Sequence, residues 1–219
     1  MIHSSVDHPP APLENVYARS KFEAEKLVLE AMAKGLKANI MRMGNLTNRT
    51  DGVFQKNYLS NAFVKRIKAV LEMGVVPEYL SDIYLEFTPV DEAAKAVMTL
   101  ISHFSADRNV FHINSTKVVY MNRFIEIMAQ LDKNIRLVPE EEFLMLFHQS
   151  AKSDSNNYLY ETFINDMDKD EKLIYDSNIR IDNQFTENYL KQLGFEWGEI
   201  GIDYLKRYID RFKSIGYFE

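Results

Sequence analysis

Short apolar runs alternate with amphipathic helical segments up to about residue 138 of this 219-residue chain, and this alternation limits the possible folds more than any other feature. Short apolar runs predict strands, whereas apolar residues that recur every three to four positions predict helices. Parallel strands need a long, usually helical connection between them, so a regular exchange of strand and helix favours a layered α/β fold. We therefore expect an α/β core with a largely parallel sheet, followed by a mostly helical segment.

Ordinary start and stop residues set the helix boundaries in this pattern. A helix is expected from Asn15 to Lys34, where Gly35 ends it, and an amphipathic helix around Phe63 is expected to end near Gly74. The other expected elements are strands over residues 38–43, 84–87, 109–113 and 135–138, and helices over residues 121–131, from 139 onward, 186–194 and 200–212.

The segment from Thr88 to Asp91 predicts another helix start. Thr88 can cap the helix, Pro89 fits its first turn, and Asp91 can reach back to the cap amide. The buried face of this helix is expected to carry Val90, Ala94, Val97 and Ile101.

The composition changes after residue 150. Residues 153–157 are polar, and residues 166–172 are almost entirely charged. Segments of this kind bury too little apolar surface to order themselves by packing. We expect residues 151–175 to be mobile or to form a helical lid, ahead of two closing helices.

Charge and composition argue against several function classes. Lys and Arg total 26 against 32 Asp and Glu, the formal net charge is −6, and no basic patch suited to nucleic acid is present. The absence of cysteine excludes disulfides, thiolate metal ligands and cysteine nucleophiles. The five histidines lack metal-ligand spacing, so no metal site is expected. No apolar run is long enough to span a membrane, and we expect a cytoplasmic protein that contacts neither membrane nor nucleic acid.

Tyr17 and Lys21 are the residues best suited to a chemical role. They lie four apart on the first expected helix, which places their Cβ atoms about 5–6 Å apart on one face. A phenol has a pKa of about 10, and a neighbouring ammonium group favours the phenolate, which makes the proton easier to give to a carbonyl oxygen. The pair can therefore act as a general acid. The alternative interpretation is a packed tyrosine beside a surface lysine.

Four sequence blocks in a fixed order carry a family resemblance. The blocks are YARSKFEAE at 17–25, RMGNLT at 42–47, DGVFQKN at 51–57 and FTPVD at 87–91. As a set they resemble the thioester reductase domains of nonribosomal peptide synthetases and carboxylic acid reductases, which belong to the extended short-chain dehydrogenase/reductase superfamily. The similarity covers roughly residues 13–145 and corresponds to the C-terminal part of such a domain.

The resemblance implies a fold, an activity and partners. The implied fold is the C-terminal portion of an extended short-chain dehydrogenase Rossmann-like fold with a mostly helical substrate-binding subdomain. Residues 1–150 would form the C-terminal half of the core with part of the substrate-binding region, and residues 151–219 a helical substrate-side or lid appendage. The implied activity is NAD(P)H-dependent reduction of an acyl or peptidyl thioester to an aldehyde or alcohol. The implied partners are a carrier protein, which holds the thioester on its phosphopantetheine arm, and upstream synthetase domains.

The resemblance also assigns roles to particular residues. Tyr17 would be the proton donor, and Lys21 would tune that proton and hold the nicotinamide ribose. Gly44, Asn45 and Leu46 would lie against the nicotinamide.

Two parts of the family's site have no counterpart in this sequence. The family's Ser or Thr that holds the carbonyl oxygen is not matched, because only Ser4 and Ser5 precede Tyr17, and no Gly-rich loop joins a strand to a helix. The chain alone is therefore expected to be inactive and to bind NADPH or NADH weakly or not at all. Two alternatives stay open: an epimerase or dehydratase that acts on a nucleotide sugar, and a non-catalytic module that docks substrate and carrier.

Overall fold

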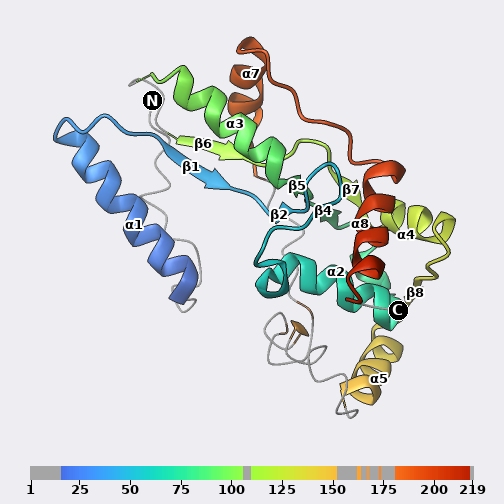
Figure 1. The fold of residues 1–219 in the computed structure, drawn as a ribbon. Helices are drawn as coiled ribbons and strands as arrows, with labels where there is room; N and C mark the ends of the chain where they lie inside the picture. Colours follow the sequence, from blue (N-terminus) through green and yellow to red (C-terminus); the bar gives the residue numbers. More distant parts are fainter. Residues whose placement is uncertain are drawn as a thin grey trace.

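Four pairs of short strands form the framework of the molecule (Figure 1). The computed structural model describes residues 16–105, 110–151, 162–163, 167, 173 and 181–217. Three pairs are parallel, namely β1 (Ile40–Met43) with β6 (Val110–Ile113), β2 (Leu46–Thr47) with β5 (Thr88–Pro89), and β3 (Val75–Pro77) with β8 (Arg136–Val138). The fourth pair, β4 (Tyr84–Leu85) with β7 (Val119–Tyr120), is antiparallel. The mainly parallel pairing confirms the predicted α/β class, although the strands form pairs rather than one continuous sheet.

Helices connect and flank these strand pairs, and the expected helices lie within a few residues of their predicted bounds. The helices are α1 (Val16–Ala33), α2 (Ala62–Met73), α3 (Val90–Ser102), α4 (Met121–Gln130), α5 (Glu140–Ala151), α7 (Gln184–Gln192) and α8 (Ile202–Ser214), with single 3-10 turns at η1 (Tyr58–Ser60) and η2 (Glu78–Leu80). Strands β2, β3, β5 and β7 were not predicted, because two or three residues are too few to show a period.

Helix α2 shows how local sequence sets an element's bounds. The Oδ1 atom of Asn61 accepts the amide hydrogen of Val64 at 3.0 Å, which caps the N-terminus. Gly74 ends the helix with φ of +64°, a left-handed conformation that suits glycine. Between them, Phe63 and Ile67 lie on the buried face. The predicted end of this helix at Gly74 is confirmed.

The predicted cap of α3 is wrong. The helix begins at Val90, and no side chain caps it. Thr88 lies instead in β5, where its buried hydroxyl donates to Glu86 and accepts from the amide of Ser115. Asp91 accepts hydrogen bonds from the amide and hydroxyl of Thr50, at 3.0 and 2.7 Å. Thr88 and Asp91 therefore form hydrogen bonds with residues distant from the helix start, and these bonds replace those of a local capping box.

The predicted buried face of α3 is also wrong by about one position. The predicted face comprised Val90, Ala94, Val97 and Ile101, whereas the buried residues are Ala93, Ala96 and Leu100. Ile101 is 54% exposed. The two alanines share a buried cluster with residues of β6 and α7.

Two hydrophobic clusters hold the molecule together. The smaller cluster joins α3, β6 and the segment around α7, with Leu100, Phe111, Leu190 and Trp197 among its buried residues. The larger cluster joins α2, β3, β4, α4, α5 and α8, and the chain's last helix contributes fully buried aromatic residues to it. Each closing helix thus completes a different cluster.

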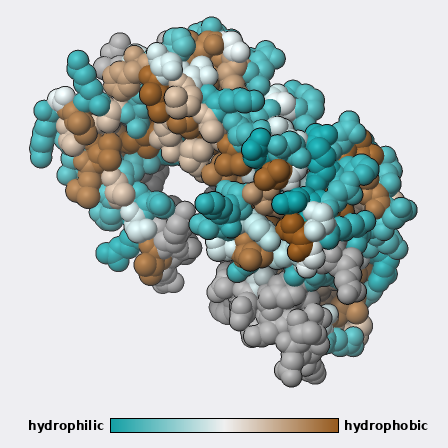
Figure 2. All heavy atoms as spheres, viewed as in Figure 1, coloured by the Kyte–Doolittle hydropathy of each residue, from teal (hydrophilic) through white to brown (hydrophobic). Residues whose placement is uncertain are grey.

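Helix α1 and strand β1 contain no buried residue among their described side chains. Leu27 is 66% exposed, and Met43 at the end of β1 is 44% exposed. Figure 2 shows hydrophobic side chains open to the surface over α1. An ion pair and a hydrogen bond between Glu25 and Arg42 link the helix to the strand. Strands of parallel sheets are normally covered on both faces, so these elements expose surface that such folds usually bury.

The predicted lid over residues 151–175 falls largely outside the described residues. Within it, Met167 and Leu173 form an isolated antiparallel bridge, and Phe163 and Leu173 are buried in the larger cluster. The division of the chain after residue 150 stays a prediction. None of the helices in the described ranges has the length and hydropathy needed to cross a bilayer.

Candidate functional site

The loop that follows β1 is held by hydrogen bonds from three directions. The amide of Gly44 donates to the carbonyl of Ile113 at 2.9 Å, and the carbonyl of Asn45 accepts the amide of Thr88 at 3.1 Å. The amide of Asn45 donates to the Glu86 carboxylate at 2.7 Å. These hydrogen bonds hold the loop at the carboxyl end of β1, the edge at which open α/β sheets bind ligands.

Glu86 is the buried carboxylate that organises this edge, with 6% of its surface exposed. Its Oε1 atom accepts both the Asn45 amide and the Thr88 hydroxyl, the latter at 3.1 Å. Burial raises the pKa of this carboxyl above its usual value, and the hydrogen bonds from Asn45 and Thr88 partly oppose that shift. Sequence reasoning missed Glu86, although a carboxylate inside an otherwise apolar strand segment was a signal that could have identified it.

Gly44 is required by close approach and not by its backbone angles. A Cβ atom at this position would lie 1.9 Å from Oε1 of Glu86 and 2.6 Å from Cβ of Asn114. Only glycine allows β1 to end so close to both neighbours.

The two predicted catalytic residues lie near the start of α1. Tyr17 is the second residue of the helix, and Lys21 follows about one turn later on an exposed position. In Figure 1, α1 and β1 diverge from the connection between them, so the N-terminal part of α1 lies apart from the loop at Gly44 to Leu46. The roles of both groups of residues stay predictions.

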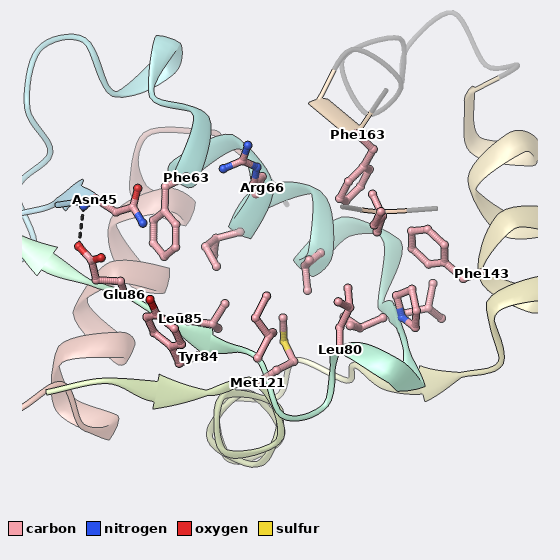
Figure 3. A pocket seen from close by; sticks show the side chains of 17 residues that line it. Asn45, Phe63, Arg66, Leu80, Tyr84, Leu85, Glu86, Met121, Phe143 and Phe163 are labelled. Atoms are coloured by element: carbon pink, nitrogen blue, oxygen red, sulfur yellow. Dashed lines mark hydrogen bonds between the residues drawn. The ribbon is translucent and has the colours of Figure 1, made fainter. Parts of the chain in front are cut away.

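A cavity opens beside this loop and runs toward α5 (Figure 3). It has a volume of about 180 Å³. Asn45, Tyr84 and Glu86 line one end, and Phe143 and Phe163 lie at the other. A second hollow of about 330 Å³, lined mainly by polar residues such as Asn114 and Glu187, lies on the other side of Tyr84.

The polar segment after β2 is tied to the last helix. The hydroxyl of Tyr204 on α8 lies 2.7 Å from the hydroxyl of Thr47 and donates to Oδ1 of Asn48 at 2.6 Å. All three residues are buried. Burial raises the pKa of Tyr204, while the Thr47 hydrogen bond lowers it in part, so the phenol stays neutral and acts as a structural donor.

Among the described residues, no cluster of acidic or histidine side chains could hold a metal ion. His112, for example, lies 3.3 Å from the guanidinium of Arg42. Burial and that positive charge lower the pKa of His112, so its ring belongs to a structural contact between β1 and β6.

Sequence comparison relates the chain to NAD-binding proteins and to large synthetases. A family of NAD-binding domains described as male sterility protein matches residues 5–97. The hybrid PKS-NRPS synthetase pynA of Aspergillus niger is 25% identical over 222 residues, which cover 92% of this chain and 6% of that protein. The PKS-NRPS hybrid synthetase acdB of Aspergillus candidus is 37% identical over 140 residues, covering 61% of this chain and 5% of that protein.

Structural comparison gives a similar result. The thiolation-reductase di-domain of an archaeal non-ribosomal peptide synthetase superposes with a TM-score of 0.81 and 34% sequence identity. The superposition covers 94% of this chain and 42% of the di-domain chain. The chain therefore spans less than half of that structure and a small fraction of the synthetases.

Proposed function

Because this chain resembles, in both sequence and fold, the C-terminal part of the thioester reductase domains of nonribosomal peptide synthetases, we propose that the protein containing it reduces acyl thioesters with NAD(P)H. The likeness to the thiolation-reductase di-domain carries this proposal, since it extends over almost the whole chain at an identity that is not limited to fold. The proposed partner is a carrier protein that presents the acyl or peptidyl group on a phosphopantetheine arm, next to upstream synthetase domains.

The proposed reaction converts a thioester, NAD(P)H and a proton into an aldehyde, a thiol and NAD(P)⁺. The nicotinamide cofactor supplies the hydride that forms the new C–H bond at the carbonyl carbon. We assign to Tyr17 the transfer of its phenolic proton to the carbonyl oxygen, because charge develops on that oxygen as the carbon is reduced. Cleavage of the C–S bond then releases the thiol and leaves the aldehyde. A second hydride and proton would give the alcohol.

Lys21 and the loop after β1 have supporting roles in this proposal. The ammonium group of Lys21 favours the phenolate form of Tyr17 and therefore lowers the cost of giving up its proton. We propose that Lys21 also holds the nicotinamide ribose, and that Gly44, Asn45 and Leu46 lie against the nicotinamide ring.

The geometry of the loop suits the nicotinamide end of the cofactor. Gly44 packs directly against Glu86 and Asn114, and the backbone of Asn45 is held by Glu86 and Thr88, so the loop offers a fixed backbone to a ligand. The Asn45 carboxamide forms no hydrogen bond with any described residue, so it can pair with a polar group of a ligand. No strand-to-helix Gly-rich loop for the pyrophosphate occurs in the sequence, so the chain supplies residues for one end of the cofactor.

A turnover assay on the full-length protein tests the proposal. An acyl group loaded on a carrier protein, or on free pantetheine, is incubated with NADPH, and both cofactor oxidation and aldehyde or alcohol formation are measured. We expect thioester-dependent oxidation of NADPH with an equivalent amount of reduced product. Turnover on nucleotide sugars, with none on thioesters, would instead support the epimerase or dehydratase alternative. Absence of turnover on both, with retained carrier binding, would support the docking module.

A further inference from the structure

The cavity beside the β1 loop has one polar end and an apolar interior. Its walls come from α2, β3, β4, α4 and α5, and the apolar part includes Leu80, Met121, Phe143 and Phe163, all less than 9% exposed. At the other end lie Asn45, Tyr84 and Glu86, next to the loop that we assign to the nicotinamide (Figure 3). A ligand that fits must therefore carry an apolar group directed inward and a polar group directed toward that loop.

The volume of the cavity sets the size of the apolar group. A protein cavity of about 150 Å³ lined by Leu, Ile and Phe binds benzene. The present cavity, at about 180 Å³, can therefore hold one aromatic ring or a branched aliphatic group of similar size. It is too small for a long fatty acyl chain to enter completely.

Glu86 sets the chemistry of the polar group. Both of its protein donors, the Asn45 amide and the Thr88 hydroxyl, bind Oε1. Within the described ranges, no donor contacts Oε2. Oε2 is not among the fully buried side-chain atoms that lack a partner, so it stays accessible at the mouth of the cavity. A ligand that covers this oxygen must supply a hydrogen-bond donor, because an acceptor covered without a partner is costly.

We propose that the cavity binds the side chain of an aminoacyl or peptidyl thioester with an aromatic or branched aliphatic residue at the thioester end, whose amide N–H donates to Glu86. In such a group the side chain, the N–H and the thioester carbonyl all branch from one carbon atom. The cavity, Glu86 and the loop at Gly44 to Leu46 likewise adjoin one another. The cavity can therefore hold the side chain, Glu86 can accept the N–H, and the loop can lie beside the thioester carbonyl. This inference rests on the proposed function and adds the class of acyl group.

Arg66 supports the competing possibility of an acidic side chain, since it also lines the cavity. The remaining wall is largely apolar, however, and a carboxylate pushed past Glu86 would meet a like charge. The structure therefore favours the uncharged side chain, and acidic substrates belong in the test.

The experiment compares kcat/KM of the full-length protein for pantetheine thioesters of N-acetylated glycine, alanine, leucine, phenylalanine and glutamate, and for the 3-phenylpropionyl thioester, which lacks the N–H. Each buried methylene is worth about fourfold in binding. We expect the leucyl and phenylalanyl thioesters to exceed the alanyl thioester by at least about tenfold. Loss of the N–H should cost the phenylpropionyl thioester at least about tenfold relative to the phenylalanyl one. Equal values across the series, or a preference for glutamate, would overturn the inference.

Three variants locate the effect. Phe143→Leu enlarges the inner end of the cavity and should raise the ratio of naphthylalanyl to phenylalanyl turnover at least about fourfold. Phe124→Leu, a buried residue of the same cluster that does not line the cavity, should leave that ratio unchanged. Glu86→Gln should remove the preference for the phenylalanyl over the phenylpropionyl thioester, because its amide presents a donor where Oε2 accepted. A preserved preference in Glu86→Gln would contradict the role of Glu86.

Calorimetric binding of the matching pantetheine amides, which cannot be cleaved, separates this inference from the proposed function. If the amides bind with the predicted preference while no thioester is reduced, the cavity assignment stands and the reductase proposal fails. If thioesters are reduced and neither turnover nor binding depends on the side chain, the reductase proposal stands and the cavity assignment fails.

Discussion

Single residues carry the proposed chemistry, beginning with Tyr17. In the full-length protein, Tyr17→Phe should lower kcat by about 10² to 10⁴, the usual worth of general-acid help, with a smaller effect on KM. Lys21→Ala should lower kcat and weaken the apparent affinity for NADPH together, because it removes both the nearby charge and the ribose contact. Steady-state kinetics with varied NADPH would measure both effects. If both variants turn over at near wild-type rates, the catalytic assignment is wrong.

A substitution at Gly44 tests how tightly the loop after β1 is packed. Gly44→Ala places a methyl group against Oε1 of Glu86 and Cβ of Asn114, and overpacking of this kind costs about 1–3 kcal/mol in the free energy of unfolding. Gly201→Ala is the comparison, because nothing lies within 4 Å of the added carbon there, although Gly201 is the N-cap of α8, where alanine is less favourable than glycine. Urea denaturation of both variants should show a larger loss of stability for Gly44→Ala. An unchanged midpoint for Gly44→Ala would mean that the loop can shift.

Glu86 should make stability depend on pH. Its folded pKa is raised by burial above the usual 4.5, so the stability contributed by the neutral carboxyl is present below that value and is lost as pH rises through the folded pKa. Glu86→Gln cannot ionise and keeps an acceptor for the Asn45 amide. The melting temperature of Glu86→Gln relative to wild type should therefore rise between acidic and neutral pH. A constant difference across that range would show that the carboxyl is not destabilised by burial.

At the scale of elements, α8 holds the segment after β2 through the Tyr204 hydroxyl and through the Arg207 guanidinium, which donates to the carbonyl of Thr50 at 2.8 Å. Tyr204→Phe leaves Thr47 and Asn48 buried without their shared partner and should cost about 1–3 kcal/mol in the free energy of unfolding. Tyr208→Phe is a matched control on the same helix, because the buried Tyr208 hydroxyl has no hydrogen-bond partner among the described residues. We expect chemical denaturation to show a loss for Tyr204→Phe and no loss, or a gain, for Tyr208→Phe. The reverse order would contradict the assigned hydrogen bonds.

The positions of helices could be predicted from the sequence where the segment with apolar periodicity was long, as in α2, which has Asn61 and Gly74 at its ends. Prediction failed where a distant partner decided the outcome. The hydroxyl of Thr88 serves Glu86 and Ser115 and not a helix N-terminus, and this exchange depends on contacts that no local pattern contains. Glu86, the organiser of the candidate site, was missed although its place in an apolar strand segment was a signal, whereas Tyr17 and Lys21 were predicted from their spacing and from the family resemblance.

At the scale of the whole molecule, the chain should bind NADPH weakly or not at all by itself. It supplies residues for the nicotinamide end only, and the phosphates lack the helix N-terminus on which they usually rest. Calorimetric titration of NADPH into the 219-residue chain would measure this directly. A micromolar dissociation constant, equivalent to about 8 kcal/mol, would show that the nucleotide site has been misplaced. The full-length protein is the positive control.

The contact between Thr47 and Tyr204 joins residues 157 positions apart in the chain. A ribosome that adds about 5–20 residues per second needs roughly 8 to 30 s to make the intervening segment. During that interval the segment after β2 has emerged without its anchor, and the larger cluster lacks the aromatic residues of α8. The nascent chain therefore exposes apolar surface until α8 is released, and this is the period in which a chaperone would have most to bind.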